Sequence, residues 1–228
     1  MADSDCYLGL SYFLQKKPQT RFAVQISGLQ IVVSRFMLTT RNILNGESML
    51  HTVHFLCPVT ASTVSHFQGV CLEALRNQAT SLQIHLSSGG GDLISGFTAY
   101  HFLKSLPVPV ITHNISNVES VANIIFMAGS ERRANAGSRF LLHPLHWEFT
   151  TQAADHARMV EWSKCLDNDF VRFVDVLNSE TQRNDIDWGA LINAATILDA
   201  DAAAANGMVT SVAKATLSDS AINWWVTC

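Results

Sequence analysis

The segment from residue 52 to residue 129 repeats one arrangement three times, an apolar run of strand length followed by a segment of helical length. The runs that predict strands are TVHFLC (52–57), SLQIHLSS (81–88) and VPVITHNI (108–115), and the segments that predict helices are 60–78, 92–106 and 116–129. Strands and helices that alternate in this way form parallel strands joined by right-handed crossovers. The sequence therefore predicts an α/β fold with a mostly parallel sheet.

The remainder of the chain extends this pattern. SRFLLHP (138–144) predicts a further strand, and residues 151–178 predict a long amphipathic helix. The segment 198–213 predicts a short helix that ends at a glycine and leads into a final strand. Residues 1–50 give weak signals, so we expect an N-terminal segment over 1–50 and a single domain over 51–228.

Composition and charge exclude several classes of protein. The net charge of −4 gives no electrostatic basis for binding nucleic acid or an anionic membrane. No apolar run reaches the length of about 18 residues that a membrane span needs, and the acidic N-terminus does not resemble a secretory signal. The five cysteines form no CxxC pair, which favours reduced thiols in a cytoplasmic protein. No spacing suggests a metal site, and we expect no cofactor.

Polar features follow three of the predicted strands. The glycine cluster SSGGGD spans residues 87–92. Ser120 lies in the third predicted helix, 116–129, and His143 lies at the end of the strand predicted after that helix. Because the carboxyl ends of parallel strands meet at one edge of a sheet, we expect these features to lie together. Each has a plain interpretation when taken alone: a tight turn, a helix cap and a structural histidine. His146 competes for any role given to His143.

In combination these segments resemble the Clp peptidase family (ClpP), whose fold is shared with crotonases. Residues 87–91 are similar to the family's N-S-P-G-G motif, and SNVESVANIIFMAG (116–129) matches its nucleophile motif without a gap. GSRFLLHP (137–144) resembles the histidine motif, and ILDADAAAANGMVTS (197–211) resembles the last landmark. The resemblance covers about residues 50–213, and it implies a ClpP/crotonase-like spiral of β-α-β units with a long protruding helix.

The resemblance implies roles for four residues in a serine-type endopeptidase. Ser120 is the nucleophile that attacks a peptide carbonyl, and His143 is the base that takes its proton. The backbone N–H groups of Gly91 and Val121 form the oxyanion hole, which suits a glycine turn and the start of a helix. The resemblance also implies peptide or unfolded protein substrates, a homo-oligomeric ring and an ATP-dependent unfoldase partner.

The sequence departs from the family pattern at the third member of the triad. The family's aspartate aligns with Ala195, which cannot orient an imidazole. Polar residues nearby are candidate substitutes: Asn193, Asp185, Asp187 and Asp199. Asp199 has a simpler interpretation as the N-cap of the following Ala-rich helix. Glu119 replaces a small residue of the family, and we expect it to act at the surface or on the helix dipole.

Three functional hypotheses remain open at this point. The first is a ClpP-like serine peptidase, with activity weakened by the missing aspartate. The second is a catalytically reduced subunit with a structural role in a mixed ring. The third is a crotonase-type acyl-CoA enzyme on the same fold. The nearly neutral segment DWGALINAAT (187–196) replaces a charged run that joins rings in the family, so a double heptamer is not expected by default.

Overall fold

The structure is a computed structural model that describes residues 49–146, 153–217 and 222–228. These residues belong to one unit, residues 46–228. The predicted N-terminal segment over 1–50 lies almost wholly outside the described residues, as do the first two residues of the helix predicted over 151–178. The boundary between segment and domain therefore stays a prediction.

A single eight-stranded sheet forms the frame of the described unit. Its main path runs β6-β5-β3-β2-β1-β8, while β4 pairs with both β3 and β7. The strands are β1 (Leu50–Phe55), β2 (Ser81–Ser88), β3 (Val110–Glu119), β4 (Glu131–Ala134), β5 (Arg139–Leu141), β6 (Ile197–Asp199), β7 (Ser211–Val212) and β8 (Ile222–Trp225). Every pairing is parallel except that of β5 with β6. The expected mostly parallel α/β fold is confirmed.

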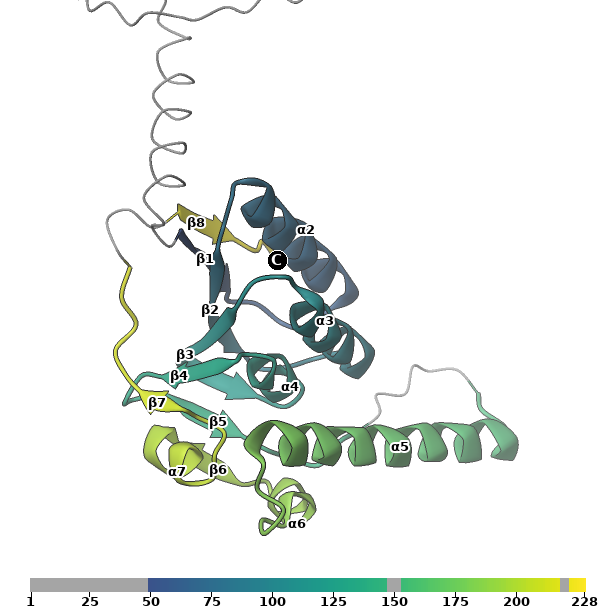
Figure 1. The fold of residues 1–228 in the computed structure, drawn as a ribbon. Helices are drawn as coiled ribbons and strands as arrows, with labels where there is room; N and C mark the ends of the chain where they lie inside the picture. The colour runs from purple at the N-terminus through teal and green to yellow at the C-terminus, as the bar shows by residue number, and fades with distance from the viewer. Residues whose placement is uncertain (1–48, 147–152, 218–221) are drawn as a thin grey trace, which may run out of the picture. The chain divides into compact units, whose positions relative to one another are not determined.

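Helices flank this sheet, and all of them except α4 begin at polar caps. They are α2 (Ala61–Arg76), α3 (Leu93–Ser105), α4 (Ala122–Met127), α5 (His156–Thr181), α6 (Trp188–Asn193) and α7 (Ala200–Ala205). Thr60 forms a capping box with Thr63, and the carboxylates of Asp92 and Asp155 cap α3 and α5. Figure 1 shows α2, α3 and α4 on one side of the sheet, with α5 extending well beyond it. The expected long protruding helix is therefore present. No helix in the described ranges is long and apolar enough to cross a membrane.

The structure corrects the helix predicted over 116–129. Its first four residues belong to β3, because Asn117, Val118 and Glu119 pair with β5. The chain then turns at Ser120, and α4 begins at Ala122. Four short elements, β4, β6, β8 and α6, were not predicted; β4 reads ERRA and carries too few apolar residues to signal a strand.

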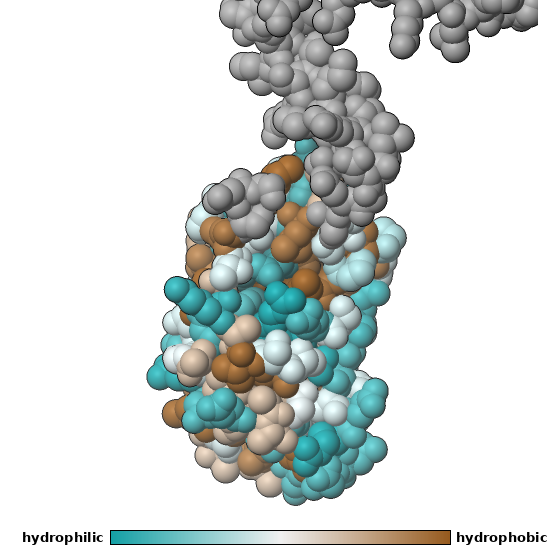
Figure 2. All heavy atoms as spheres, turned by 60° about the vertical axis from the view of Figure 1, so that its left-hand side comes forward, coloured by the Kyte–Doolittle hydropathy of each residue, from teal (hydrophilic) through white to brown (hydrophobic). Residues whose placement is uncertain are grey.

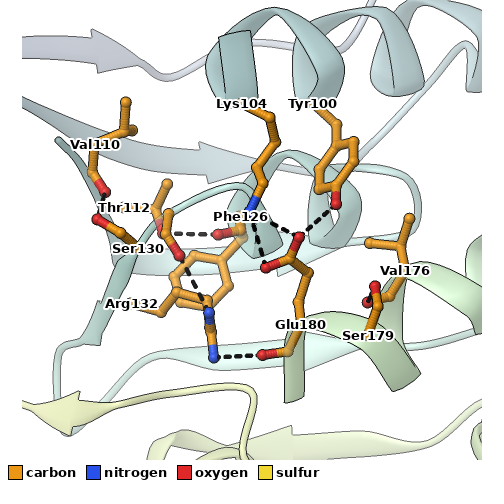
Figure 3. Close-up of polar contacts among 11 residues, drawn as sticks. Tyr100, Lys104, Val110, Thr112, Phe126, Ser130, Arg132, Val176, Ser179 and Glu180 are labelled. Carbon is orange, nitrogen blue, oxygen red and sulfur yellow. Dashed lines mark hydrogen bonds and ion pairs between the residues drawn. The ribbon is translucent and has the colours of Figure 1, made fainter. Parts of the chain in front are cut away.

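One buried guanidinium joins the ends of several elements (Figure 3). Arg132 in β4 donates hydrogen bonds to the carbonyl oxygens of Gly129, Glu180, Gly207 and Met208, at distances of 2.8–3.2 Å. The carboxylate of Glu180 accepts hydrogen bonds from two side chains of α3. Its oxygens lie 2.5 Å from the Tyr100 hydroxyl and 3.1 Å from the Lys104 ammonium. Carbonyls at helix ends have no partner within the helix. The guanidinium supplies partners where α4, α5 and α7 end.

A row of three buried histidines crosses the sheet. His54, His85 and His113 lie opposite one another on β1, β2 and β3. The ring centroids are 4.9 Å apart in the first pair and 5.6 Å apart in the second. Burial, followed by the neighbouring imidazoles, lowers the pKa of His85 to about 4. Burial likewise lowers the pKa of His113, so His85 and His113 are neutral at pH 7.

The histidine row predicts that the domain loses stability in mild acid. Between pH 6.5 and about 4 the unfolded chain protonates position 85 while the folded protein does not. The free energy of unfolding therefore falls as the pH is lowered through this window, by up to about 1.4 kcal/mol per pH unit for this site. Urea denaturation at a series of pH values measures this slope, which we expect to be smaller in His85→Gln. The exposed His101→Gln is the control, and equal slopes in all three proteins would contradict the prediction.

Candidate active site

The glycine turn after β2 is held in place by the loop that follows β1. The N–H of Val59 donates to the carbonyl of Gly90, and the N–H of Asp92 donates to the carbonyl of Val59, both at 2.8 Å. Gly90 and Gly91 have φ angles of 88° and 145°, which side chains rarely allow. A Cβ on Gly91 would lie 2.2 Å from the Val59 oxygen, and one on Gly90 would lie 2.5 Å from the Cβ of Ser120. The turn therefore needs glycines and packs directly on Ser120.

Ser120 lies at a sharp turn between β3 and α4. Its φ angle of 54° is in the left-handed region, which is uncommon for a residue other than glycine. Backbone hydrogen bonds fix this conformation, because the Ser120 N–H donates to Leu141 and its carbonyl accepts from Asn123. No side-chain hydrogen bond caps α4, so the helix-cap interpretation of Ser120 is wrong. A strained serine between strand and helix is typical of hydrolase nucleophiles.

Two backbone N–H groups beside Ser120 are free to bind a ligand. Neither Gly91 nor Val121 donates a backbone hydrogen bond within the described part of the chain. The hydrogen bonds to Val59 involve the residues on either side of Gly91, so its own N–H points away from that loop. Two unpaired N–H donors next to a nucleophile suit the negative oxygen of a tetrahedral intermediate.

His143 follows β5 and is half-buried. Its Nδ1 lies 2.9 Å from the carbonyl oxygen of Pro144, and its ring stacks on His146 at a centroid distance of 5.9 Å. A carbonyl only accepts, so Nδ1 carries a proton and Nε2 of the neutral ring has a free lone pair. This is the tautomer that a general base needs. Within the described residues no hydrogen bond joins Ser120 Oγ to His143, and such contacts are often long before substrate binds.

The register of β5 and β6 locates the position opposite His143. The two strands are antiparallel, and Leu141 lies opposite Ile197. The N–H of Leu142 donates to the carbonyl of Thr196 at 2.9 Å, which extends the pairing by one residue. The next residues along the two segments are His143 and Ala195, which lie beyond the ends of β5 and β6, and Ala195 has a left-handed φ of 51°. The pairing therefore brings the segment that holds Ala195 beside the segment that holds His143.

The other polar candidates for the third position have partners elsewhere or none. Asp187 and Asp199 accept hydrogen bonds from backbone N–H groups in the first turns of α6 and α7, at 2.9 and 2.8 Å. Asp185 forms an ion pair with Arg183, whose hydrogen bonds lower the pKa of that carboxyl. Asn193 is exposed at the end of α6. Within the described chain none of them hydrogen-bonds His143, so its Nδ1 partner is the Pro144 carbonyl.

Glu119 lies in β3, so a helix-dipole role is wrong. Its carboxylate pairs with Arg139 at 2.8 Å and joins β3 to β5 at the surface. Both side chains line a cavity of about 430 Å³, together with Asn117 and residues 56–58 and 87–89. Glu119 therefore forms part of a polar wall beside the glycine turn.

Two supporting groups were missed by reasoning from the sequence. Val59 brackets the glycine turn through its backbone, which no side-chain pattern reveals. The carbonyl of Pro144 occupies Nδ1 of His143, and the adjacent His-Pro pair was the one available signal. The structure brings Ser120, Gly91 and Val121 together and places the segment that holds Ala195 beside the segment that holds His143. The described chain shows no cluster of three or more His, Cys, Asp or Glu that could hold a metal ion.

Comparisons with known proteins give a matching family and a similar fold. The family described as Clp protease matches residues 58–216, a range that includes all the candidate site residues. The fold is similar to that of a solved mutant of ClpP1 from Listeria monocytogenes, with a TM-score of 0.63 and 16% sequence identity. That likeness covers 78% of this chain and 96% of the other, and at this identity it shows the fold alone. No curated protein matches the sequence. The expected ClpP/crotonase-like fold is confirmed.

The contact between the glycine turn and Ser120 predicts different tolerance of alanine at adjacent glycines. Gly90→Ala forces a side chain into Ser120 at a positive φ, so we expect the free energy of unfolding to fall by about 2 kcal/mol or more. Gly89→Ala is the control, since nothing lies within 4 Å of its Cβ and the change should be below about 0.5 kcal/mol. Urea denaturation of the two variants compares them. Equal losses would show that the turn does not pack on Ser120 as described.

Proposed function

Because this chain belongs to the Clp protease family, we propose that it is a serine peptidase that cleaves peptide bonds with Ser120 and His143. The observation that carries this proposal is the left-handed conformation of Ser120 at a strand–helix turn beside two free N–H donors. No cofactor takes part in the mechanism.

In the proposed mechanism His143 Nε2 removes the proton of the Ser120 hydroxyl as Oγ attacks the substrate carbonyl. The N–H groups of Gly91 and Val121 stabilise the oxyanion of the tetrahedral intermediate. His143 then returns the proton to the leaving amine, and an acyl-enzyme remains on Ser120. Water releases the acyl group with His143 again as base. The Oγ and Nε2 atoms must come within about 3 Å of each other for the first transfer.

The neighbourhood of His143 supports weak activity. The Pro144 carbonyl holds the imidazole in the required tautomer, but it is neutral and cannot stabilise the imidazolium as a carboxylate does. Loss of the carboxylate in a serine protease costs about 10⁴ in turnover. We therefore propose a slow peptidase.

The absence of a carboxylate at position 195 supports a second candidate function. Ala195 lies in the segment beside His143, so a subunit with little activity that builds a mixed ring is the alternative. No observation favours the acyl-CoA alternative. The two remaining candidates differ in whether Ser120 reacts, which makes this residue the point to test.

The proposed partners follow from the family. They are peptide or unfolded protein substrates, further copies in a homo-oligomeric ring, and an ATP-dependent unfoldase in the cytoplasm. Exposed apolar side chains on α5 support an assembly role for this helix: Met159, Val160 and Val171. The face of the domain in Figure 2 shows hydrophobic residues in separate groups among hydrophilic ones. The net charge of −4 does not favour nucleic acid as a partner.

An active peptidase predicts covalent labelling of Ser120. A fluorophosphonate probe reacts with serines that are activated as nucleophiles, so we expect a labelled band from the wild-type protein and none from Ser120→Ala. Ser116→Ala, which removes an exposed hydroxyl four residues earlier, is the matched control and should label as the wild type does. Absence of label on the folded wild-type protein would contradict the peptidase proposal and favour the structural subunit.

The position of Ala195 predicts a gain of activity when a carboxylate is introduced. Ala195→Asp places an acid in the segment beside His143, and aspartate tolerates the left-handed φ of 51° at this position. We expect kcat/KM for a short fluorogenic peptide to rise at least about tenfold, given the factor of about 10⁴ that such a carboxylate contributes elsewhere. Ala194→Asp is the control, since it adds the same charge one residue away at an ordinary φ of −82°. Equal rates in the two variants would contradict the assigned geometry.

A further inference from the structure

The register of β1 and β8 brings together two cysteines that are far apart in the sequence. The strands are parallel, and His54 lies opposite Trp225. Cys57 and Cys228 stand three residues further along each chain, so the parallel strands lead both cysteines to the same end of the pair. Neighbouring strands are about 4.8 Å apart, which falls within the Cα separations of about 4.4–6.8 Å that disulfides span.

Side-chain contact supports the same pairing independently of the register. Cys228 is close enough to Cys57 to raise the pKa of its thiol, and both are free cysteines. Cys57 is buried beneath the loop after β1, whereas Cys228 is exposed. Burial, and secondarily the neighbouring Cys228, raises the pKa of the Cys57 thiol to about 12. The Cys228 thiol is therefore the one that reacts with a reagent from solution, and the Cys57 thiol can react with Cys228 in a second step.

We propose that Cys57 and Cys228 form a thiol–disulfide pair that a small-molecule disulfide such as oxidised glutathione converts to an intramolecular disulfide. The Cys228 thiolate attacks one sulfur of oxidised glutathione, forms a mixed disulfide and releases one glutathione thiol. The Cys57 sulfur, after losing its proton to solvent, attacks the Cys228 sulfur and releases the second glutathione. Two protein thiols are oxidised and one small disulfide is reduced to two thiols, so atoms and electrons balance.

The position of this pair links its redox state to the loop that holds the glycine turn. Pro58 alone separates Cys57 from Val59, whose backbone brackets Gly90 and Asp92. The other end of the link follows β8, where the Thr227 N–H and hydroxyl both contact His66 of α2. Oxidation therefore fastens the end of β8 to the loop beneath the turn. This proposal does not depend on the peptidase function.

The test uses the full chain, reduced and then incubated with excess oxidised glutathione. Denaturation with N-ethylmaleimide and mass spectrometry then count the free thiols. We expect two fewer alkylated cysteines than in the reduced protein, and a protease digest should yield one peptide pair linked through Cys57 and Cys228. The apparent Tm should rise by roughly 5 °C or more on oxidation, because a disulfide that closes a long loop restricts the unfolded chain most.

Serine variants separate the proposed pair from other thiol chemistry. Cys228→Ser replaces an exposed residue and should abolish both the linked peptide and the rise in Tm. Cys165→Ser removes an exposed cysteine of α5 and should leave both unchanged. Recovery of Cys57 and Cys228 as alkylated residues after oxidation would overturn the proposal. A glutathione adduct that persists on Cys228, a disulfide to another cysteine, or an unchanged Tm would overturn it equally.

Discussion

The guanidinium of Arg132 is the interaction on which the arrangement of helices around the sheet depends. A buried cation is costly unless it is fully hydrogen-bonded, and burial lowers the pKa of this group. Four carbonyl oxygens offset that cost, and they come from the residues that end α4, α5 and α7. One of these oxygens belongs to Gly129, two residues beyond the end of α4, and α4 itself begins two residues after Ser120.

The candidate site combines a rigid nucleophile with a weakly supported base. Ser120 is fixed from three directions, by β5, by Asn123 and by the glycine turn, so its backbone strain is stored in well-packed structure. His143 is held by one hydrogen bond to the carbonyl of the next residue. A neutral acceptor selects the tautomer but leaves the charge of the imidazolium without a partner. His143 therefore lacks a charged partner, and within the described residues no hydrogen bond joins it to Ser120.

Sequence reasoning succeeded where one residue type decides the local structure. Asp199 was identified as a cap because a carboxylate before an alanine run has few other roles, and the structure confirms it. The periodic segments also gave the strands and helices from residue 50 to residue 106. The start of α4 was misplaced because the polar residues before Ser120 resemble a helix cap, whereas pairing with β5 makes them strand. The hydrogen bond from His143 Nδ1 to the Pro144 carbonyl depends on the direction of the imidazole side chain, which the spacing of residues in the sequence does not define.

The backbone around Ala195 narrows the interpretation of the missing acid. If the alignment were shifted, a nearby carboxylate would take the role of the missing acid, but in the described chain Asp187 and Asp199 cap helices and Asp185 pairs with Arg183. Ala195 has a φ of 51°, a conformation in which alanine is less stable than aspartate or asparagine. The chain thus accepts a backbone cost at this residue without the side-chain hydrogen bonds that usually offset it.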